Sequence, residues 1–186
     1  MRIVAAKGYG ATTVSDLTGE AGISRTTFYE LFDDKEACFL AAYDNAVDLL
    51  VRRISVAYEA EERWPDRARA GLRTLLEALA AEPEQARLAL VDVAAAGPAA
   101  QRRLRAAVRR LTPFFDEGRD FAPGGRNLPA NTSRMAIGGV TGLISDELLA
   151  NRAKQLPSLL SDVLFATLVP YIGPDAAARE VDRLTR

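Results

Sequence analysis

The chain has 186 residues, of which 48% are hydrophobic and 26% are charged, with 24 Lys and Arg against 25 Asp and Glu. This composition is typical of a globular protein that buries a core, and it argues against disorder and against a basic coat that would bind nucleic acid everywhere. With no His and one Cys, the chain lacks His/Cys zinc sites, Ser-His-Asp or Cys-His catalysis and internal disulfides.

The strongest local signals lie in residues 8–39, which read GYGATTVSDLTGEAGISRTTFYELFDDKEACF. Thr13 followed by Asp16 is a helix-start box. Gly22 then ends this short helix in the left-handed conformation that glycine adopts at low cost, and Ser24 caps the next helix. Two short helices joined by a turn with glycine predict a helix-turn-helix, whose second helix enters the DNA major groove.

The second helix is predicted to bury one face and to offer the other face to DNA. The inward residues are expected to be Phe28, Leu31 and Phe32. The outward residues that suit base or phosphate contacts are Arg25, Thr26, Thr27 and Tyr29. Arginine can bond to guanine O6 and N7, threonine can offer a hydroxyl or a methyl group, and tyrosine can donate to phosphate. Thr13 and Lys35, at the starts of the flanking helices, are candidate phosphate contacts.

These residues resemble the DNA-binding domain of the tetracycline-repressor-like (TetR) transcriptional regulators, through G-Y-x-x-T-T-V, A-G-I-S, T-F-Y-x-x-F and K-E within about residues 3–40. The resemblance implies an all-helical homodimer, with a helix-turn-helix domain at residues 1–40 and an effector-binding and dimerisation domain at residues 41–186. It also implies that residues 1–7 are the last turns of a longer first helix. Members usually repress transcription from palindromic operator DNA until a small-molecule effector releases them.

The charge of the N-terminal region keeps a second interpretation open. Residues 1–45 hold four basic residues (Arg2, Lys7, Arg25, Lys35) against seven acidic ones, so weak phosphate affinity is expected. Glu30 would face phosphates as a like charge unless it accepts from cytosine N4. The alternatives are therefore a ligand-released DNA-binding repressor and a ligand-binding helical dimer that has lost DNA binding. An enzyme is not expected, because no residue pattern proposes a reaction.

The rest of the chain is predicted to be helical, so the expected fold class is all-α. Apolar residues at three- and four-residue spacing predict one helix from residue 35 to about residue 63. Beyond it, prolines are expected to mark helix starts, because the first helical position tolerates a missing N–H. These prolines are Pro65, Pro83, Pro98, Pro129, Pro157 and Pro174. Pro113 falls inside an apolar stripe and should kink or end its helix, and residues 123–127 form the clearest loop.

Helices between about residues 84 and 149 are expected to enclose any effector. The candidate pocket residues, mostly aromatic with two acids, are Tyr58, Trp64, Asp92, Phe114, Phe115, Met135 and Glu147. Because few of them are polar, an apolar or amphipathic ligand is favoured, although aromatic stripes of this kind are often plain core. The arginine-rich residues 102–110 are interpreted as a solvated helix face, and Cys38 as a small core residue.

Three glycines in residues 138–142 fall inside a predicted helix, where each costs about 1 kcal/mol relative to Ala. Close approach of another backbone would explain them, either within the chain or between subunits. Together with the following helix they match the position where the family builds a four-helix dimer interface. The candidate interface residues are Gly138, Gly142, Leu160, Val163, Leu164, Thr167, Leu168 and Tyr171.

The most apolar stretch of the sequence lies near its C-terminal end, where Asp162 and Pro170 interrupt it. An uninterrupted membrane span needs ~20 apolar residues, and the N-terminus lacks the pattern of a signal peptide. We therefore expect a soluble, cytoplasmic homodimer that has no membrane span and needs no metal or cofactor.

Overall fold

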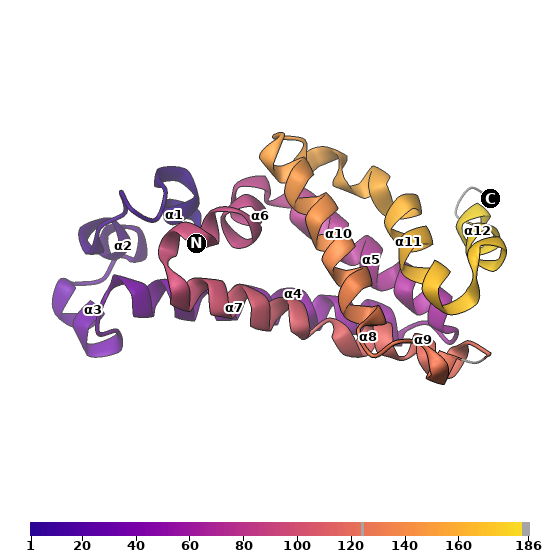
Figure 1. The fold of residues 1–186 in the computed structure, drawn as a ribbon. Coiled ribbons are helices and arrows are strands. Elements are labelled where there is room, and N and C mark those ends of the chain that lie inside the picture. The colour runs from indigo at the N-terminus through magenta and orange to yellow at the C-terminus, as the bar shows by residue number, and fades with distance from the viewer. Residues whose placement is uncertain (124, 184–186) are drawn as a thin grey trace.

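The computed structural model describes residues 1–123 and 125–183, and within them the chain forms helices and no strand (Figure 1). The all-α prediction is confirmed. The α-helices of the N-terminal third are α1 (Arg2–Lys7), α2 (Val14–Ala21), α3 (Arg25–Leu31) and α4 (Lys35–Glu59). The later α-helices are α5 (Trp64–Ala81), α6 (Pro83–Leu90), α7 (Pro98–Arg109), α8 (Thr112–Asp116), α9 (Gly118–Phe121), α10 (Thr132–Leu149), α11 (Leu160–Ile172) and α12 (Pro174–Asp182). Three 3₁₀ helices are η1 (Asp92–Ala96), η2 (Gly125–Asn127) and η3 (Ala153–Leu159).

Local capping chemistry shapes α2 and α3 as the sequence predicts. The Thr13 hydroxyl accepts from the Asp16 amide at 3.2 Å, and Asp16 Oδ2 accepts from the Thr13 amide at 2.9 Å, which completes a capping box. Gly22 ends α2 with φ 66° and ψ 30°, in the left-handed region that favours glycine. Ser24 then caps α3 by accepting from the Thr27 amide at 3.0 Å.

The long helix α4 connects the two ends of the molecule. It has 25 residues and starts at Asp34, whose carboxylate accepts from the Ala37 amide at 2.7 Å. Helices α1 to α3 gather at its start, α7 lies beside it, and α5 and α8 to α12 occupy the other end (Figure 1). The helix ends at Glu59, before the expected position near residue 63, because Arg63 is already extended as the N-cap of α5.

The prolines mark helix starts in four of the six predicted cases. Pro65, Pro83, Pro98 and Pro174 occupy the first or second position of their helices. Pro113 likewise lies at the start of α8, so it ends the preceding helix and does not kink it. The other two predictions are wrong: Pro129 precedes the start of α10 at Thr132, and Pro157 lies inside η3.

Two apolar clusters form the core. The larger one joins the second half of α4 with α5, α8, α10, α11 and α12, and the smaller one joins α1, the first half of α4, α6, η1 and α7. Val4 of α1 is buried in the smaller cluster beside Phe39, Tyr43 and Leu88. The expected division between residues 40 and 41 falls inside α4, and α1 packs on α6.

One helical stretch of the described residues, Ala153–Ile172, is long and apolar enough to cross a membrane, contrary to the expectation that none would qualify. It consists of η3 and α11. Leu156, Val163, Leu164 and Leu168 of this stretch are buried in the larger cluster of the protein itself. A third of its most apolar window is buried within the protein, and length and composition alone are weak evidence for a membrane span.

Candidate DNA-binding surface and ligand cavity

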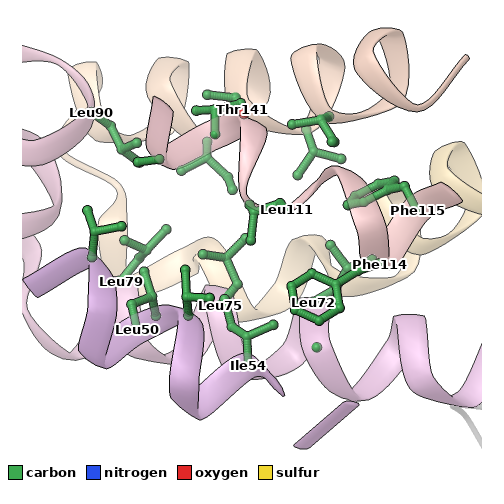
Figure 2. A pocket seen from close by; sticks show the side chains of 18 of the residues that line it. Leu50, Ile54, Leu72, Leu75, Leu79, Leu90, Leu111, Phe114, Phe115 and Thr141 are labelled. Atoms are coloured by element: carbon green, nitrogen blue, oxygen red, sulfur yellow. The ribbon is translucent and has the colours of Figure 1, made fainter. Parts of the chain in front are cut away.

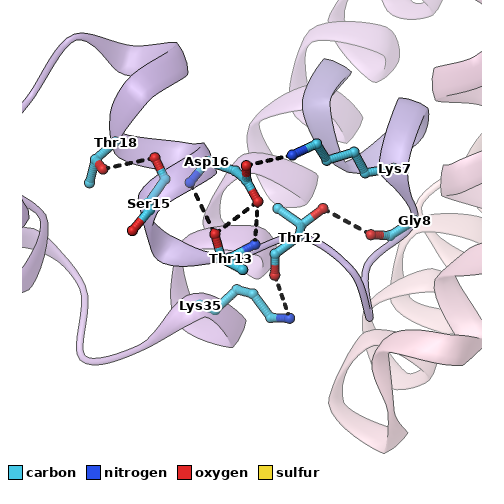
Figure 3. Close-up of polar contacts among 8 residues, drawn as sticks. All are labelled: Lys7, Gly8, Thr12, Thr13, Ser15, Asp16, Thr18 and Lys35. Carbon is cyan, nitrogen blue, oxygen red and sulfur yellow. Dashed lines mark hydrogen bonds and ion pairs between the residues drawn. The ribbon is translucent and has the colours of Figure 1, made fainter.

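The start of α2 is held by an ion pair across the preceding turn (Figure 3). Lys7 Nζ donates to Asp16 Oδ1 at 2.5 Å, while Asp16 Oδ2 accepts from the Thr13 amide and hydroxyl. The Lys7 hydrogen bond, followed by those from Thr13, lowers the pKa of the Asp16 carboxyl to about 2. The Thr13 side chain, predicted to contact phosphate, is exposed and is at the same time part of this cap.

Lys35 forms hydrogen bonds within the protein. Its Nζ donates to the carbonyl oxygens of Tyr9 and Thr12, both at 2.9 Å, and lies 4.4 Å from the centroid of the Tyr9 ring. Figure 3 shows the bond to Thr12. The phosphate contact predicted for Lys35 stays a prediction, and the structure adds a second role, because two of its three N–H donors are engaged by backbone carbonyls. The ammonium thereby ties the turn before α2 to the start of α4.

The outward face of α3 is open to solvent. Arg25, Thr26 and Tyr29 are exposed, whereas Thr27 is half-buried with its hydroxyl 3.0 Å from that of Ser24. All four remain predicted DNA contacts, and the exposure of three of them is what such a role requires. Glu30, the acidic residue of this helix, is exposed as well.

The inward face of α3 is narrower than predicted. Phe28 is 1% exposed, and Phe32, four residues on, is half-buried with its ring centroid 5.6 Å from that of Phe28. Leu31 is 64% exposed, so its predicted burial is wrong. Helix α3 ends at Leu31, and Phe32 follows it in extended backbone and packs against Phe28.

A cavity of about 120 Å³ lies in the larger part of the molecule, between α4 and α5 on one side and α7, α8 and α10 on the other (Figure 2). No Asp, Glu, Lys or Arg is among the described residues that line it. Its walls are mainly aliphatic: Val47, Leu50, Val51, Ile54, Leu72, Leu75, Leu79, Leu90, Leu104, Val108, Leu111, Ile137, Val140 and Ile144. This composition suits an apolar ligand, as predicted.

Three of the seven predicted pocket residues, Tyr58, Phe114 and Phe115, line the cavity. The other four lie elsewhere. Trp64 is buried against Tyr171, with ring centroids 4.8 Å apart, and Met135 is 75% exposed. The two acids pair with arginines outside the cavity, Asp92 with Arg87 at 3.2 Å and Glu147 with Arg152 at 2.7 Å. These four assignments are corrected, because none of the four residues lines the cavity.

About half of the lining residues that the prediction missed come from α4 and α5, outside the expected limits of residues 84 to 149. The side chains from α4 are Tyr43, Val47, Leu50, Val51, Ile54 and Tyr58. Their three- and four-residue spacing marks one helix face and was readable in the sequence as core. What the spacing did not reveal is that this face is only partly filled by neighbouring side chains.

The polar atoms at the cavity differ in how well they are satisfied. The Tyr43 hydroxyl donates to the Ala89 carbonyl at 3.2 Å, and burial raises the pKa of Tyr43 to about 12. The Tyr58 hydroxyl lies 2.8 Å from Glu117 Oε2 and 3.0 Å from the Phe114 carbonyl, and burial raises its pKa as well. Both tyrosines therefore stay neutral and have acceptors for their hydrogens, whereas the buried Thr167 hydroxyl has no partner.

The predicted subunit face stays a prediction, and its residues on α10 and α11 differ in exposure. Gly138 and Gly142 are exposed, and a Cβ added at either would meet no atom within 4 Å. On α11, however, the predicted residues other than half-buried Leu160 lie inside the protomer: Val163, Leu164, Thr167, Leu168 and Tyr171. The helix turns its other side outward, where Phe165 is 38% exposed.

Comparisons with known proteins agree with this arrangement. Residues 1–42 match the family model of bacterial regulatory proteins of the tetR family. A curated relative, the uncharacterised HTH-type transcriptional regulator YerO of Bacillus subtilis (strain 168), is 35% identical over 54 residues, which are 29% of this chain. The chain matches 19% of the length of that relative.

Solved structures share the fold over nearly the whole chain. The fatty acid degradation regulator FadR of Bacillus halodurans superposes with a TM-score of 0.78 at 16% identity, covering 90% of this chain and 89% of that one. FadR of Bacillus subtilis, solved in complex with stearoyl-CoA, gives a TM-score of 0.76 at 16% identity, over 91% and 94%. A tetR-family regulatory protein of Rhodococcus RHA1 gives 0.70 at 18%, over 92% of both chains.

Proposed function

We propose that the protein is a cytoplasmic transcriptional repressor of the tetR family and not an enzyme, which is supported by the match of residues 1–42 to the model of that family. It binds operator DNA through α3 and is released by a small apolar or amphipathic molecule. The observation that carries the proposal is the exposed face of α3, where Arg25, Thr26 and Tyr29 project from a helix fixed by capping bonds on both sides. Such a helix can enter a major groove without rearrangement.

The uncharged cavity supports the ligand half of the proposal. The Bacillus subtilis FadR structure was solved with stearoyl-CoA, and that protein has the same fold as this chain. A fatty acyl chain, or another apolar molecule, is therefore the ligand class we propose for the cavity. Its volume of about 120 Å³ is below the ~300–1,000 Å³ of ordinary ligand sites. A ligand of that size must push the cavity walls apart.

Helix α4 supplies the connection between the cavity and the DNA-binding surface. Its start holds the turn before α2 through Lys35, and its later turns, from Tyr43 to Tyr58, line the cavity. With 25 residues it is roughly 38 Å long. A ligand that separates α4 from α7 therefore displaces the helix that positions α2 and α3. Because ligand and DNA then favour different arrangements, each weakens the binding of the other.

A homodimer is part of the proposal, because two recognition helices about one DNA turn apart, ~34 Å, are needed to read a palindromic operator. The outward faces of α10 and α11 support it. Gly138, Gly139 and Gly142 leave the surface of α10 flat, and Met135, Leu149 and Phe165 are large apolar side chains exposed nearby on the same pair of helices. An exposed apolar patch next to a flat glycine surface suits close contact with a second copy.

Mobility-shift titration at two salt concentrations tests the proposal. The DNA is the segment flanking the gene of this protein, and the control is a scrambled duplex of equal length. A repressor binds the flanking DNA more tightly than the scrambled DNA at both salt concentrations, and both affinities fall as salt rises. The rival function, a ligand-binding dimer without DNA binding, is favoured by the excess of acidic residues in the first 45 residues. It predicts equal, weak affinity for both duplexes.

A further inference from the structure

One hydroxyl group at the cavity has no hydrogen-bond partner. Thr167, in the middle of α11, is 1% exposed and lines the cavity. Among the buried side-chain polar atoms of the described residues, its Oγ1 alone lacks a partner. Threonine in a helix can satisfy its hydroxyl with a backbone carbonyl of the preceding turn, as Thr74 does with Ala70 at 2.9 Å. Thr167 leaves that option unused.

An unsatisfied hydroxyl inside an apolar core destabilises the folded state, and valine has nearly the same shape without this cost. A hydrogen-bond partner from outside the protomer would therefore stabilise the Thr167 hydroxyl. The tyrosine hydroxyls of the cavity differ in this respect, since Tyr43 and Tyr58 have acceptors within the protein. Thr141 also lines the cavity, but it is half-buried, whereas Thr167 is fully buried. Thr167 is thus the fully buried position where an added molecule gains a hydrogen bond that the protein alone does not make.

The cavity wall also limits which chemical groups the bound molecule can have. No charged side chain of the described residues lines it, so an ionised group buried there would lose its hydration without gaining a counter-charge. A neutral hydroxyl or carbonyl oxygen loses much less, and it can pair with Oγ1, which both donates and accepts. The remaining surface of the molecule must be apolar to fit the aliphatic walls.

We propose that Thr167 Oγ1 binds an uncharged oxygen, either a hydroxyl or a carbonyl, on the otherwise apolar part of the effector that enters the cavity. This inference rests on the proposed ligand-binding function and narrows its ligand class from any apolar molecule to one with a single neutral oxygen at this depth. Thr167 then determines specificity between an oxygenated ligand and a plain hydrocarbon of the same size.

A matched pair of small probes, phenol and benzene, tests the proposal at neutral pH, where phenol is uncharged. An apolar protein cavity of about 150 Å³ is known to hold benzene, so the two probes are of the right scale. Their dissociation constants are measured by calorimetric titration for the wild type and for Thr167→Val. The wild type is expected to favour phenol over benzene about 5- to 10-fold more than the variant does, which is the effect of one net hydrogen bond.

Thr74→Val is the matched control, because it also removes a helical threonine hydroxyl, but one that is satisfied within its helix and lies outside the cavity lining. The ratio of its dissociation constants for phenol and benzene should equal that of the wild type. Thr167→Val should also raise the melting temperature of the ligand-free protein by about 2–4 °C. A lower melting temperature would mean that the hydroxyl has a partner within the protein, which overturns the inference.

The outcomes separate this inference from the function on which it rests. If both probes bind and the phenol-to-benzene ratio is the same in the wild type and Thr167→Val, the cavity remains a ligand site and the role of Thr167 is overturned. If neither probe binds either protein, the cavity is no ligand site, and the ligand half of the proposed function fails together with the inference.

Discussion

The DNA-binding end and the cavity end of the molecule are built by different kinds of interaction. Around α2 and α3, the structure depends on polar contacts between residues close in sequence: Thr13 with Asp16, Ser24 with Thr27, and Asp34 with Ala37. The cavity has almost no polar contacts, and its wall gathers side chains from Tyr43 to Thr167. Helix α4 takes part in both regions, with a polar start and an apolar later face.

This difference explains how the two ends can serve different roles. Short-range capping bonds fix the orientation of α3 before any DNA is present, as a recognition helix requires. Aliphatic contacts are non-directional, so the cavity walls can part around a ligand without breaking specific hydrogen bonds. In the proposed function, the DNA-binding end therefore keeps its shape, and the cavity end changes shape when the ligand binds.

The largest expected effect is the loss of DNA binding at one end of the molecule while the cavity end stays intact. Phe28→Ala removes a ring that is 1% exposed between α2 and α3, and it should cost ~3–5 kcal/mol of local stability. DNA binding should be lost, while benzene binding and most of the helical signal in circular dichroism should persist. The control is Leu31→Ala on the same helix, whose 64% exposed side chain should contribute little. Loss of benzene binding in Phe28→Ala would show that the two ends fold as one unit.

The next effect concerns the outer face of the cavity end. Gly142→Arg places a guanidinium where a Cβ meets no atom of the protomer, so the monomer should fold normally. In a dimer that buries this face, the unpaired charge should cost on the order of 3 kcal/mol. Ultracentrifugation should then show monomers at concentrations where the wild type is dimeric, with unchanged circular dichroism. Ala178→Arg, on the exposed side of α12, is the control, and a dimer that survives Gly142→Arg places the interface elsewhere.

A smaller loss of DNA affinity is expected when a predicted base contact of α3 is removed. Arg25→Ala should cost ~1–3 kcal/mol per half-site and relax the sequence preference, because residues at the start of a recognition helix reach base edges. The loss should be larger on operator DNA than on a scrambled duplex in mobility-shift titrations. Arg73→Ala, on the exposed surface of α5, removes the same charge from the other end and should have little effect. Equal losses of affinity for both duplexes in Arg25→Ala would mean that Arg25 contacts phosphates and not bases.

The smallest expected effect concerns the link between the ends. Lys35→Met keeps the length of the side chain but removes its hydrogen bonds to the Tyr9 and Thr12 carbonyls, which should loosen the turn before α2 by about 1 kcal/mol. Operator affinity should fall modestly, and loss of these bonds alone leaves the slope of its logarithm against the logarithm of salt concentration unchanged. A phosphate contact would instead reduce that slope by about 1 per subunit. A reduced slope would confirm the phosphate contact that the sequence predicts for Lys35, and an unchanged slope would contradict it.

The contrast between local and long-range contacts also explains which features could be predicted from the sequence. The capping box at Thr13, the left-handed Gly22 and the cap at Ser24 depend on neighbours within a few residues, so their pattern is visible in the sequence. The hydrogen bonds of Lys35 were not predicted because its partners, Tyr9 and Thr12, lie more than twenty residues away. Helix caps such as Asp16 with Thr13 have a recognisable residue pattern, whereas ion pairs such as Asp92 with Arg87 do not, even when their partners lie five residues apart.

The cavity end was predicted as helices that enclose a pocket, but only three of the seven residues assigned to that pocket line the cavity. Periodicity shows that one face of α4 is apolar, but the space beside it depends on how Leu111 of one segment and Val140 of another pack across it. On α11 both faces are apolar, so the pattern did not reveal that Val163 points inward and Phe165 outward. Assigning such faces requires the positions of the helices packed on either side.

The central claim is that the cavity end controls the DNA-binding end through α4, and mutual titration tests it most directly. Acyl-CoA thioesters of increasing chain length are first screened by thermal shift, and the one that stabilises the protein most is then titrated by calorimetry with and without saturating operator DNA. The account predicts that operator DNA weakens ligand binding by the same factor by which the ligand weakens operator binding. Identical ligand affinity in both titrations would contradict it, since the two ends would then be independent.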